Sequence, residues 1–520
     1  MSAYLKSYVI AVDIGTTSAK TLLVDKAGKI TASYSVHYPM DTPSPEIAEQ
    51  DPEIILQAVI TGIGATIRQS GISGDQVLCV SFSSAMHSLM AVNQEGLPLT
   101  PLITWADNRS AAYASLLRGN GEGQKLYTRT GTPIHPMSPL IKLMWMRDNQ
   151  PDIFAQAYKF IGMKEYIFYR LFKSYVVDYS IASATGLFNI NRMDWDDLAL
   201  EYAGILADRL SRLVPASHRE IGLGQEIAMA MGLPTSTPFV VGAADGPLAN
   251  LGAGAVDPGI FALSIGTSGA VRSIVSQPVV DPEGRLFCYA LADGLWTIGG
   301  PINNGGIVFR WTRDVLASLE AEDAIRKGRD PYDYLTELAH DIAPGAGGLI
   351  FLPFLLGERA PYWNTNARGV FFGLSMNHSK KHMIRSVMEG IAFRLHSVVT
   401  ALEELTGPAR EIRVSGGFAR STLWRQMLSD VMDRSVTVMD TVESSGLGAA
   451  YMGFWAMGEF PNLLGVKDWV RCTERHISDQ ENYNTYKELI GIYMRLYHQL
   501  SGEFDAIAEY QLRAQKQLTD

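Results

Sequence analysis

The chain has 520 residues, which is more than one hydrophobic core supports and is typical of two domains of ordinary size. Its composition, 47% hydrophobic and 19% charged, is that of a globular protein, and three widely spaced cysteines argue against a disulfide framework or a zinc site. A net charge of −10 without a basic cluster argues against nucleic acid as a partner, because nucleic acid selects positive surfaces.

The N-terminal apolar run is interrupted by Asp13, and no uninterrupted apolar stretch is long enough for a membrane helix. Lys6 is the only early cation and no small-residue cleavage site follows, so the run lacks the pattern of a signal peptide. We therefore expect a cytoplasmic protein without a membrane partner.

The first predicted element is a strand at Tyr8 to Val12, a run rich in β-branched and aromatic residues. It ends at Asp13 and is followed by Gly15 and the hydroxyl-rich turn 16–18. Glycine lets backbone approach a ligand closely, and the turn offers N–H and O–H donors to phosphate oxygens. Asp13 would repel a phosphate, so its use there would be to hold a hydrated divalent cation. An ordinary hairpin turn with a buried acid is the alternative.

The same pattern recurs in the second half of the chain. The triplet Ile-Gly-Thr at 14–16 returns at 265–267, again after a strand-like run, about half a chain length later. Ser264 stands where Asp13 stands in the first copy. The repeat predicts two tandem lobes of similar architecture, with the metal-binding acid in one of them only.

Two further strands are predicted at Thr21 to Asp25 and Lys29 to Val36, and the turn between them gives the sheet an antiparallel start. A helix is predicted after Asp51, which is a good N-cap, with Pro52 in its first turn. The next strand is predicted at Val77 to Phe82.

Polar side chains follow two predicted strands where each ends. Ser83 to His87 follows one of them, and Asp107 to Arg109 follows a strand at Leu102 to Trp105. Open α/β sheets bind ligands beyond the carboxyl ends of their strands, so these segments predict a ligand site. The alternative is that the acid and the arginine merely pair and cap the next helix.

The stretch Arg129 to Met146 carries three prolines in seven residues, which predicts a rigid loop before a helix. His135 lies in this loop and is a candidate ligand contact, with an ordinary loop histidine as the alternative.

A further strand ending in an acid is predicted at Val240 to Gly246. Asp245 at its end could reach a substrate hydroxyl and the phosphate being transferred, which is the geometry of a general base. Capping of the following helix is a compatible alternative.

In the second half, Asn303 to Gly306 opens a predicted helix, and Val414 to Ser421 reads as strand, glycine turn and helix. Both turns would bring bare backbone against a flat ligand. Glu443 to Ala450 is a small-residue helix start, for which close packing is the favoured use. The rest of the chain, toward its C-terminal end, is predicted to form a peripheral amphipathic helix.

These pieces, taken in order, resemble the FGGY family of carbohydrate kinases over essentially the whole chain. The motifs that carry the resemblance are D-I-G-T-T-S at 13–18, P-L-I-K-L-M-W at 139–145, A-A-D-G at 243–246, S-I-G-T-S at 264–268, G-L-S at 373–375 and S-G-G at 415–417. The resemblance implies an α/β fold of two tandem ribonuclease-H-like domains, of the actin and hexokinase superfamily, around a central cleft. We expect the domains to span residues 1–251 and 252–520.

The resemblance also implies roles for single residues. Asp13 would organise Mg²⁺ and Asp245 would be the catalytic base. The residues implied to bind ATP are Thr16, Thr17, Ser18 and Lys20 at the phosphates, and Gly266, Thr267, Gly306, Arg310, Gly417 and Ser421 around the rest of the nucleotide. The residues implied at the substrate are Met86, His87, Asp107, Arg109, His135 and Asp245.

Within the family, the loops at 85–88, 104–110 and 129–140 are similar to those of gluconokinases, which implies phosphorylation of D-gluconate to 6-phosphogluconate by Mg-ATP bound between the domains. Xylulokinase or another pentose or polyol kinase of the family is the close alternative, and a non-kinase ATPase of the same superfamily is a more distant one. The resemblance leaves a homodimer open.

A sugar acid needs a local cation at its carboxylate, because the chain as a whole is acidic. Arg109 is the first candidate, since its planar fork can meet a carboxylate bidentately, which neither His87 nor His135 can do. Lys142 falls inside an apolar helix, where packing or an ion pair is expected instead.

Overall fold

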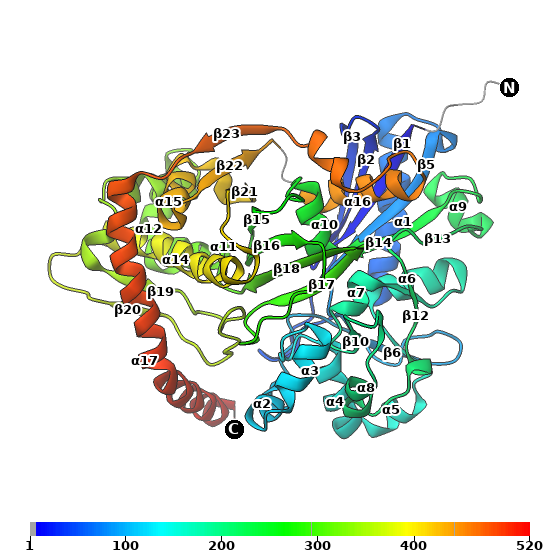
Figure 1. Cartoon of the computed structure of the whole chain (residues 1–520), viewed down its shortest axis with the longest axis horizontal. Helices are drawn as coiled ribbons and strands as arrows, with labels where there is room; N and C mark the ends of the chain where they lie inside the picture. Colours follow the sequence, from blue (N-terminus) through cyan, green and yellow to red (C-terminus); the bar gives the residue numbers. More distant parts are fainter. Residues whose placement is uncertain (1–6, 293, 441–442, 520) are drawn as a thin grey trace. The chain divides into compact units, whose positions relative to one another are not determined.

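The computed structural model describes residues 7–292, 294–440 and 443–519, and the chain forms two compact units (Figure 1). The first unit comprises Met1–Asp257, Ile274–Ile298 and Glu443–Val470, and the second comprises Pro258–Ser273, Gly299–Val442 and Arg471–Asp520. Two later segments of the chain therefore return to the first unit. The expected division into residues 1–251 and 252–520 remains a prediction.

The first unit contains a six-stranded sheet of order β13-β14-β5-β1-β2-β3. Its strands are β1 (Tyr8–Ile14), β2 (Ser18–Asp25), β3 (Ile30–His37), β5 (Val77–Ser84), β13 (Arg219–Glu220) and β14 (Phe239–Ala244). The first three pair antiparallel, as predicted, while β5 pairs parallel with both β1 and β14. The carboxyl ends of β1, β5 and β14 consequently meet at one edge of the sheet.

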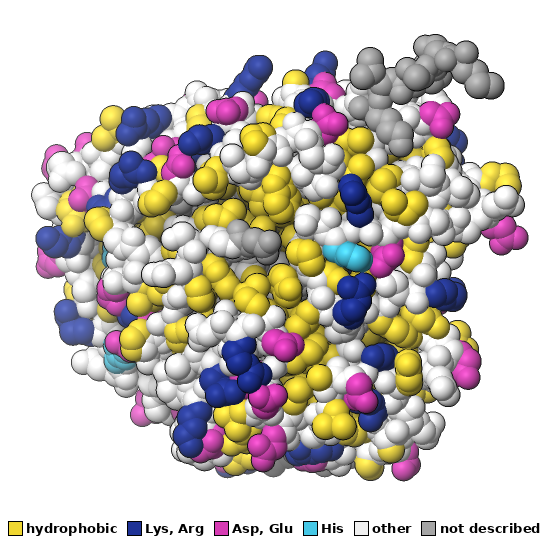
Figure 2. Space-filling model, turned by 45° about the vertical axis from the view of Figure 1, so that its right-hand side comes forward, with side chains coloured by type: hydrophobic (Ala, Val, Ile, Leu, Met, Phe, Trp, Pro, Cys, Tyr) yellow, Lys and Arg dark blue, Asp and Glu magenta, His cyan; other side chains and the backbone are white. Residues whose placement is uncertain are grey.

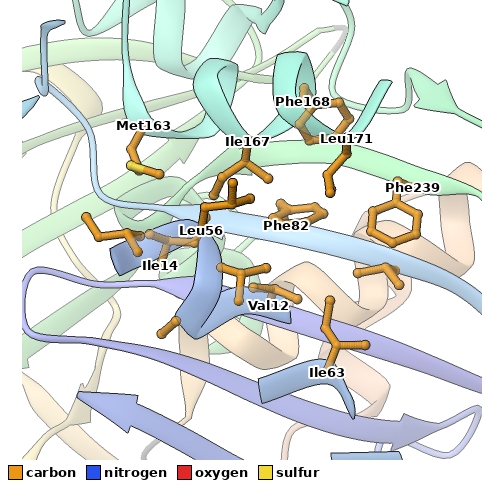
Figure 3. Packing of buried hydrophobic residues seen from close by; sticks show 14 of the residues in the cluster. Val12, Ile14, Leu56, Ile63, Phe82, Met163, Ile167, Phe168, Leu171 and Phe239 are labelled. Atoms are coloured by element: carbon orange, nitrogen blue, oxygen red, sulfur yellow. The ribbon is translucent and has the colours of Figure 1, made fainter. Parts of the chain in front are cut away.

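The side chains of β1 alternate between two faces, and a helix covers each face. Ile10 and Val12 pack into the cluster that includes α1 (Pro52–Ser70), part of which is shown in Figure 3. Val9 and Ala11 pack on the opposite side, with α16 (Ser444–Ala456). Helix α1 begins as predicted, because the Asp51 side chain accepts from the Glu53 N–H. With both faces covered, only the sheet edge remains for a ligand.

The first unit also contains many short strands and helices outside this sheet. They are β4 (Glu49–Gln50), η1 (Gly74–Gln76), β6 (Met90–Val92), β7 (Leu102–Ile103), α2 (Ala111–Gly119), α3 (Glu122–Thr130), α4 (Pro139–Asn149), α5 (Pro151–Gln156), β8 (Lys159–Ile161), α6 (Met163–Phe172), β9 (Val176–Asp178), α7 (Tyr179–Ser183), β10 (Phe188–Asn189), β11 (Asp194–Trp195), α8 (Asp197–Ala203), η2 (Ala207–Arg209), β12 (Arg212–Val214), α9 (Gln225–Met231), α10 (Asp245–Gly252), β17 (Phe287–Ala292) and η6 (Leu464–Asp468). The strand predicted through Trp105 ends at Ile103, because a turn closes where the Asp107 N–H donates to the Thr104 carbonyl.

The second unit repeats the pairing pattern of the first. Strand β15 (Ile260–Ile265) pairs antiparallel with β16 (Gly269–Val275) and parallel with β21 (Glu411–Ser415), which pairs parallel with β22 (Ser435–Met439). Strand β23 (Cys472–His476) closes the series antiparallel. This sequence of pairings is that of β2, β1, β5, β14 and β13, as the recurring Ile-Gly-Thr triplet predicted.

Helices and short elements complete the second unit. They are α11 (Gly306–Trp311), η3 (Thr312–Leu316), α12 (Ser318–Arg326), α13 (Pro331–His340), η4 (Ala346–Gly348), β19 (Ile350–Leu352), β20 (Val370–Phe372), α14 (Lys380–Thr406), η5 (Gly417–Arg420), α15 (Thr422–Met432) and α17 (Gln480–Thr519), while β18 (Leu295–Ile302) runs into this unit from the preceding segment. Helix α17 confirms the predicted helical tail. None of the helices within the described ranges has the length and apolar character needed to cross a bilayer. On the face shown in Figure 2, positive and negative side chains are interspersed.

Helices α10 and α16 pack with their backbones in close contact, which confirms the predicted use of the small residues at the start of α16. A Cβ atom on Gly448 would lie 2.0 Å from the Leu248 carbonyl oxygen, and one on Gly252 would lie 1.8 Å from the Ser444 carbonyl oxygen. Only glycine fits at these two positions.

We expect Gly448→Ala to lower the free energy of unfolding by about 1 to 3 kcal/mol, because the added methyl group has no room and the two helices must separate. Urea denaturation followed by circular dichroism measures this change. Gly502→Ala is the matched control, since Gly502 lies inside α17 and a methyl group added there would meet nothing within 4 Å, and alanine favours a helix by roughly 0.5 to 1 kcal/mol. Equal stability of the two variants would contradict the packing argument.

Candidate functional site

The turn between β1 and β2 is held in shape by side chains from outside it. The Gly15 N–H donates to the Ser18 carbonyl at 3.0 Å and closes the turn. The Tyr38 hydroxyl donates to the Gly15 carbonyl at 2.7 Å, and the Gln50 amide donates to the Thr16 carbonyl at 2.7 Å. Thr17 at the tip is exposed. The turn is therefore a fixed, hydroxyl-bearing loop open to a ligand.

Asp13 lies at the base of this turn with two hydroxyl groups donating to its carboxylate. The Ser83 hydroxyl donates to one oxygen at 2.6 Å and the Ser445 hydroxyl donates to the other at 2.6 Å. Burial, with the Asp13 charge as a second cause, raises the pKa of the nearby Tyr38 phenol. The carboxylate is half-buried, so it presents a negative charge at the sheet edge without being enclosed.

The start of α16 is part of this site, although the sequence favoured close packing as the use of this segment. The Lys20 ammonium is opposite Asp13 in the β1–β2 register and forms an ion pair with both oxygens of Glu443, at 2.8 and 2.9 Å. Ser445 donates to Asp13 from the same helix turn. Glu443 and Ser445 were missed because no local pattern connects them to a turn more than 400 residues earlier.

The loop after β5 carries two predicted substrate residues. His87 is buried and has a positive φ of 71°, which non-glycine residues seldom adopt. Its Nδ1 atom lies 2.8 Å from the Ala184 carbonyl oxygen, and its ring meets Tyr289 edge-on. Met86 is half-buried and packs against the cluster that contains Tyr289. The His87 ring therefore connects this loop to Ala184 and to Tyr289.

The Arg109 fork is engaged by two acids of the protein. Its Nε and Nη2 atoms donate to Asp107, at 2.9 and 2.7 Å, and Nη2 also donates to Glu49 at 2.6 Å. Asp107 is fully buried and also accepts from the Ala48 N–H. The Arg109 guanidinium lies 5.2 Å from the ring centre of Trp145. The pairing of Asp107 with Arg109 that the sequence left as an alternative is present.

Lys142 connects the loop that contains His87 with the loop that contains Asp107 and Arg109. Its ammonium is fully buried and donates to the His87 carbonyl at 2.6 Å and to the Thr104 carbonyl at 2.7 Å. Burial lowers the pKa of Lys142 to about 7. Its bonds to the two loop carbonyls differ from the packing or ion pair expected from its place in an apolar helix. An isolated lysine among apolar residues is the one local signal that could have identified it.

His135 is buried in the loop before α4, where its Nδ1 atom accepts from the Met137 N–H at 3.1 Å. The Ser110 hydroxyl donates to the Pro136 carbonyl at 3.3 Å and ties this loop to the segment that follows Arg109. The proline-rich loop is therefore adjacent to the second polar loop.

Asp245 is the first residue of α10 and follows β14 directly. The register pairs Ala244 with Ser84 on β5, and Ser84 with Ile14 on β1. Asp245 and the phosphate turn thus lie at the same edge of one sheet. One Asp245 carboxylate oxygen accepts from the Gly246 N–H at 2.7 Å, within the first turn of α10, whose N-cap residue is Ala244.

The second unit contains a pocket of about 440 Å³. All six residues predicted to surround the nucleotide line it, namely Gly266, Thr267, Gly306, Arg310, Gly417 and Ser421. A size of this order suits a cofactor or a drug-sized ligand.

The walls of this pocket combine aromatic rings with bare backbone. Phe309 lies 5.7 Å from Trp424 and 5.8 Å from Tyr332, measured between ring centres. A Cβ atom on Gly266 or Gly417 would meet nothing within 4 Å, so their backbone faces open space. A ligand with a flat ring could contact the aromatic side chains here, and a charged group on the same ligand could contact backbone N–H groups.

Comparison with known proteins identifies the two halves of the chain. The family model described as the FGGY family of carbohydrate kinases, N-terminal domain, matches residues 8–252, and the C-terminal domain model of the same family matches residues 261–457. The chain is 48% identical to the gluconokinase of Bacillus subtilis (strain 168) over 508 residues, which is 98% of this chain and 99% of the relative.

Two solved structures from Lactobacillus acidophilus are similar to the whole chain. One is described as gluconate kinase and the other as ligand-bound xylulose kinase; each is 34% identical with a TM-score of 0.91, over 96% of this chain and 99% of the other. These matches confirm the expected fold class, two α/β domains of the actin and hexokinase-like sugar kinases.

We expect the buried ammonium of Lys142 to make stability depend on pH. Its pKa is lowered in the fold, from 10.5 to about 7, so the unfolded chain binds the proton more tightly between these values. The free energy of unfolding therefore falls as the pH is lowered from 10.5 toward 7, with a slope of up to about 1.4 kcal/mol per pH unit. Above pH 10.5 the lysine is neutral in both states and this loss is absent. Urea unfolding of the parent and of Lys142→Met at pH 7, 8 and 9 should show the parent gaining relative stability with pH. Lys125→Met, at an exposed lysine, is the control, and parallel curves for Lys142→Met and the parent would refute this expectation.

Proposed function

Since the chain belongs to the FGGY family of carbohydrate kinases, we propose that it transfers the γ-phosphoryl group of ATP to D-gluconate and releases 6-phosphogluconate and ADP. The observation that supports gluconate as the substrate is the 48% identity to a gluconokinase, over nearly all of both chains. Identity to the Lactobacillus acidophilus xylulose kinase is 34%. Because that structure is as similar in fold as the gluconate kinase, xylulose is the second candidate substrate.

The polar loops of the first unit suit a polyol, which needs many directed hydrogen bonds. His87, Asp107 and Arg109 come from two loops that Lys142 holds together. Arg109 is the proposed cation for the substrate carboxylate, although it already forms ion pairs with Glu49 and Asp107. A bound carboxylate would therefore share its guanidinium.

The proposed base is Asp245. It lies at the sheet edge that also carries Asp13 and the phosphate turn, and phosphoryl transfer depends mainly on positioning and charge stabilisation. Asp245 would accept the proton of the substrate hydroxyl as that oxygen attacks the γ-phosphorus, and the bond from phosphorus to the β,γ-bridging oxygen breaks to leave ADP.

Mg²⁺ fits the surroundings of Asp13. A half-buried carboxylate beside two serine hydroxyls offers hard oxygen donors, and Mg²⁺ commonly binds proteins through one or two carboxylates while keeping its waters. When bound, the ion would neutralise phosphate charge. Lys20 would contact a phosphate by leaving Glu443, so the ion pair and the nucleotide compete for the same ammonium.

The pocket of the second unit is the proposed nucleotide site. Gly266 and Gly417 would bring bare backbone against the ligand, and the aromatic wall around Phe309 would meet the adenine ring. Arg310 is exposed at this pocket and would add a positive charge near the phosphates.

We expect Asp245→Asn to lower kcat by about 10²- to 10⁴-fold, since the amide accepts no proton. ADP affinity, measured by calorimetry, should stay within about threefold of the parent. Asp257→Asn, at an acid paired with Lys467, is the control and should keep full turnover. Turnover of Asp245→Asn within a few-fold of the parent would contradict the role of Asp245 as the base.

We expect Arg109→Gln to weaken gluconate binding by about ten- to hundredfold, because a hydrogen bond to a charged group is worth roughly 1.5 to 3 kcal/mol. A neutral polyol of similar length should lose much less affinity. The ratio of the two KM values, in a coupled assay of ADP release, measures the difference. Arg192→Gln, at an exposed ion pair, is the control. Equal losses for charged and neutral substrates would favour the xylulose alternative.

A further inference from the structure

The end of β14, which Asp245 follows directly, is held by two side chains from neighbouring elements. The Lys164 ammonium, on α6, donates to the Ala243 carbonyl at 3.2 Å. The Ser180 hydroxyl, on α7, accepts from the Ala244 N–H at 3.2 Å. These groups belong to the last two residues of β14 before Asp245, and their bonds come from outside the sheet.

Lys164 is itself fixed by an ion pair. Its ammonium lies 2.6 Å from a carboxylate oxygen of Asp178, and the two side chains are 2% and 0% exposed. The other Asp178 oxygen accepts from the Ile181 N–H at 3.0 Å and caps α7, the helix that carries Ser180. One buried ion pair thus connects α6, α7 and the end of β14.

Charge is unusually concentrated around this ammonium. Burial lowers the pKa of Lys164, and the attraction of the Asp178, Glu165 and Asp245 carboxylates acts against that effect. Burial of an ion pair does not by itself increase stability, because desolvation opposes the attraction. A buried lysine next to the end of β14 therefore suggests a use beyond the stability of the fold.

We propose that Lys164 is a positioning residue for Asp245: with Asp178 and Ser180 it fixes the end of β14, so that the Asp245 carboxylate stays aimed at the substrate hydroxyl. This inference rests on the proposed role of Asp245 as base. A misplacement of the order of 1 Å at a reacting group can reduce a rate about 10²-fold. Loss of the contacts that hold the end of β14 should therefore lower turnover strongly.

A double-mutant cycle tests the proposal. Lys164→Met is combined with Asp178→Asn, so that no unpaired carboxylate remains buried, and kcat is measured in the parent and in the Asp245→Asn background. We expect a fall of about 10- to 100-fold in the parent and less than about threefold in the Asp245→Asn background. ADP affinity should not change. Lys159→Met is the matched control, because this lysine also donates to two backbone carbonyls, Asp208 and Leu210, and should leave kcat unchanged.

Ser180→Ala is the second variant, for the case in which the paired substitution fails to fold. It removes only the acceptor of the Ala244 N–H, and it should lower kcat about three- to tenfold, with that effect absent in the Asp245→Asn background. Equal losses in both backgrounds, or no loss at all, would overturn the positioning role while the base stands. Full turnover of Asp245→Asn alone would overturn the base itself and the positioning role with it.

Discussion

The parallel pairing of β1, β5 and β14 is the constraint on which the first unit's site depends. Parallel strands bring their carboxyl ends to one edge, and these three strands end at Asp13, Ser83 and Asp245 or directly beside them. Helices α1 and α16 cover the two faces of the same sheet, so the edge is where polar groups can meet a ligand. The second unit repeats the pairing around β15 and β21, and its pocket includes the corresponding turn, 265–267.

Much of this arrangement could be predicted from local sequence pattern. The run at 8–12, the cap at Asp51 and the glycine turn at 415–417 each follow from rules that act over a few residues, and the structure contains the strands, the helix and the turn they predict. The repeated Ile-Gly-Thr triplet correctly indicated a repeated pairing pattern. The resemblance to the FGGY family, and not local pattern, predicted six residues around the nucleotide, and all six line one pocket.

The contacts that local pattern could not predict are those between distant segments. Lys142 donates to carbonyls of two loops whose positions are set by the fold, and nothing in its helix identifies those acceptors. The sequence left open the pairing of Arg109 with Asp107, but the second partner of the guanidinium, Glu49, depends on where strand β4 lies. The positive φ of His87 is a backbone property that its sequence neighbours do not indicate.

The return of α16 to the first unit has a consequence for how the protein is made. Asp13 and Ser445 are 432 residues apart in the chain, and their hydrogen bond joins parts of the same unit. At a synthesis rate of about 5 to 20 residues per second, the hydroxyl emerges roughly 20 to 90 s after the carboxylate. Throughout that interval one face of the nascent sheet, with Val9 and Ala11, lacks the helix that covers it in the finished protein. The first unit can therefore complete its fold only after residues 443–470 have left the ribosome, and a chain truncated before them would expose an apolar surface open to chaperones or to aggregation.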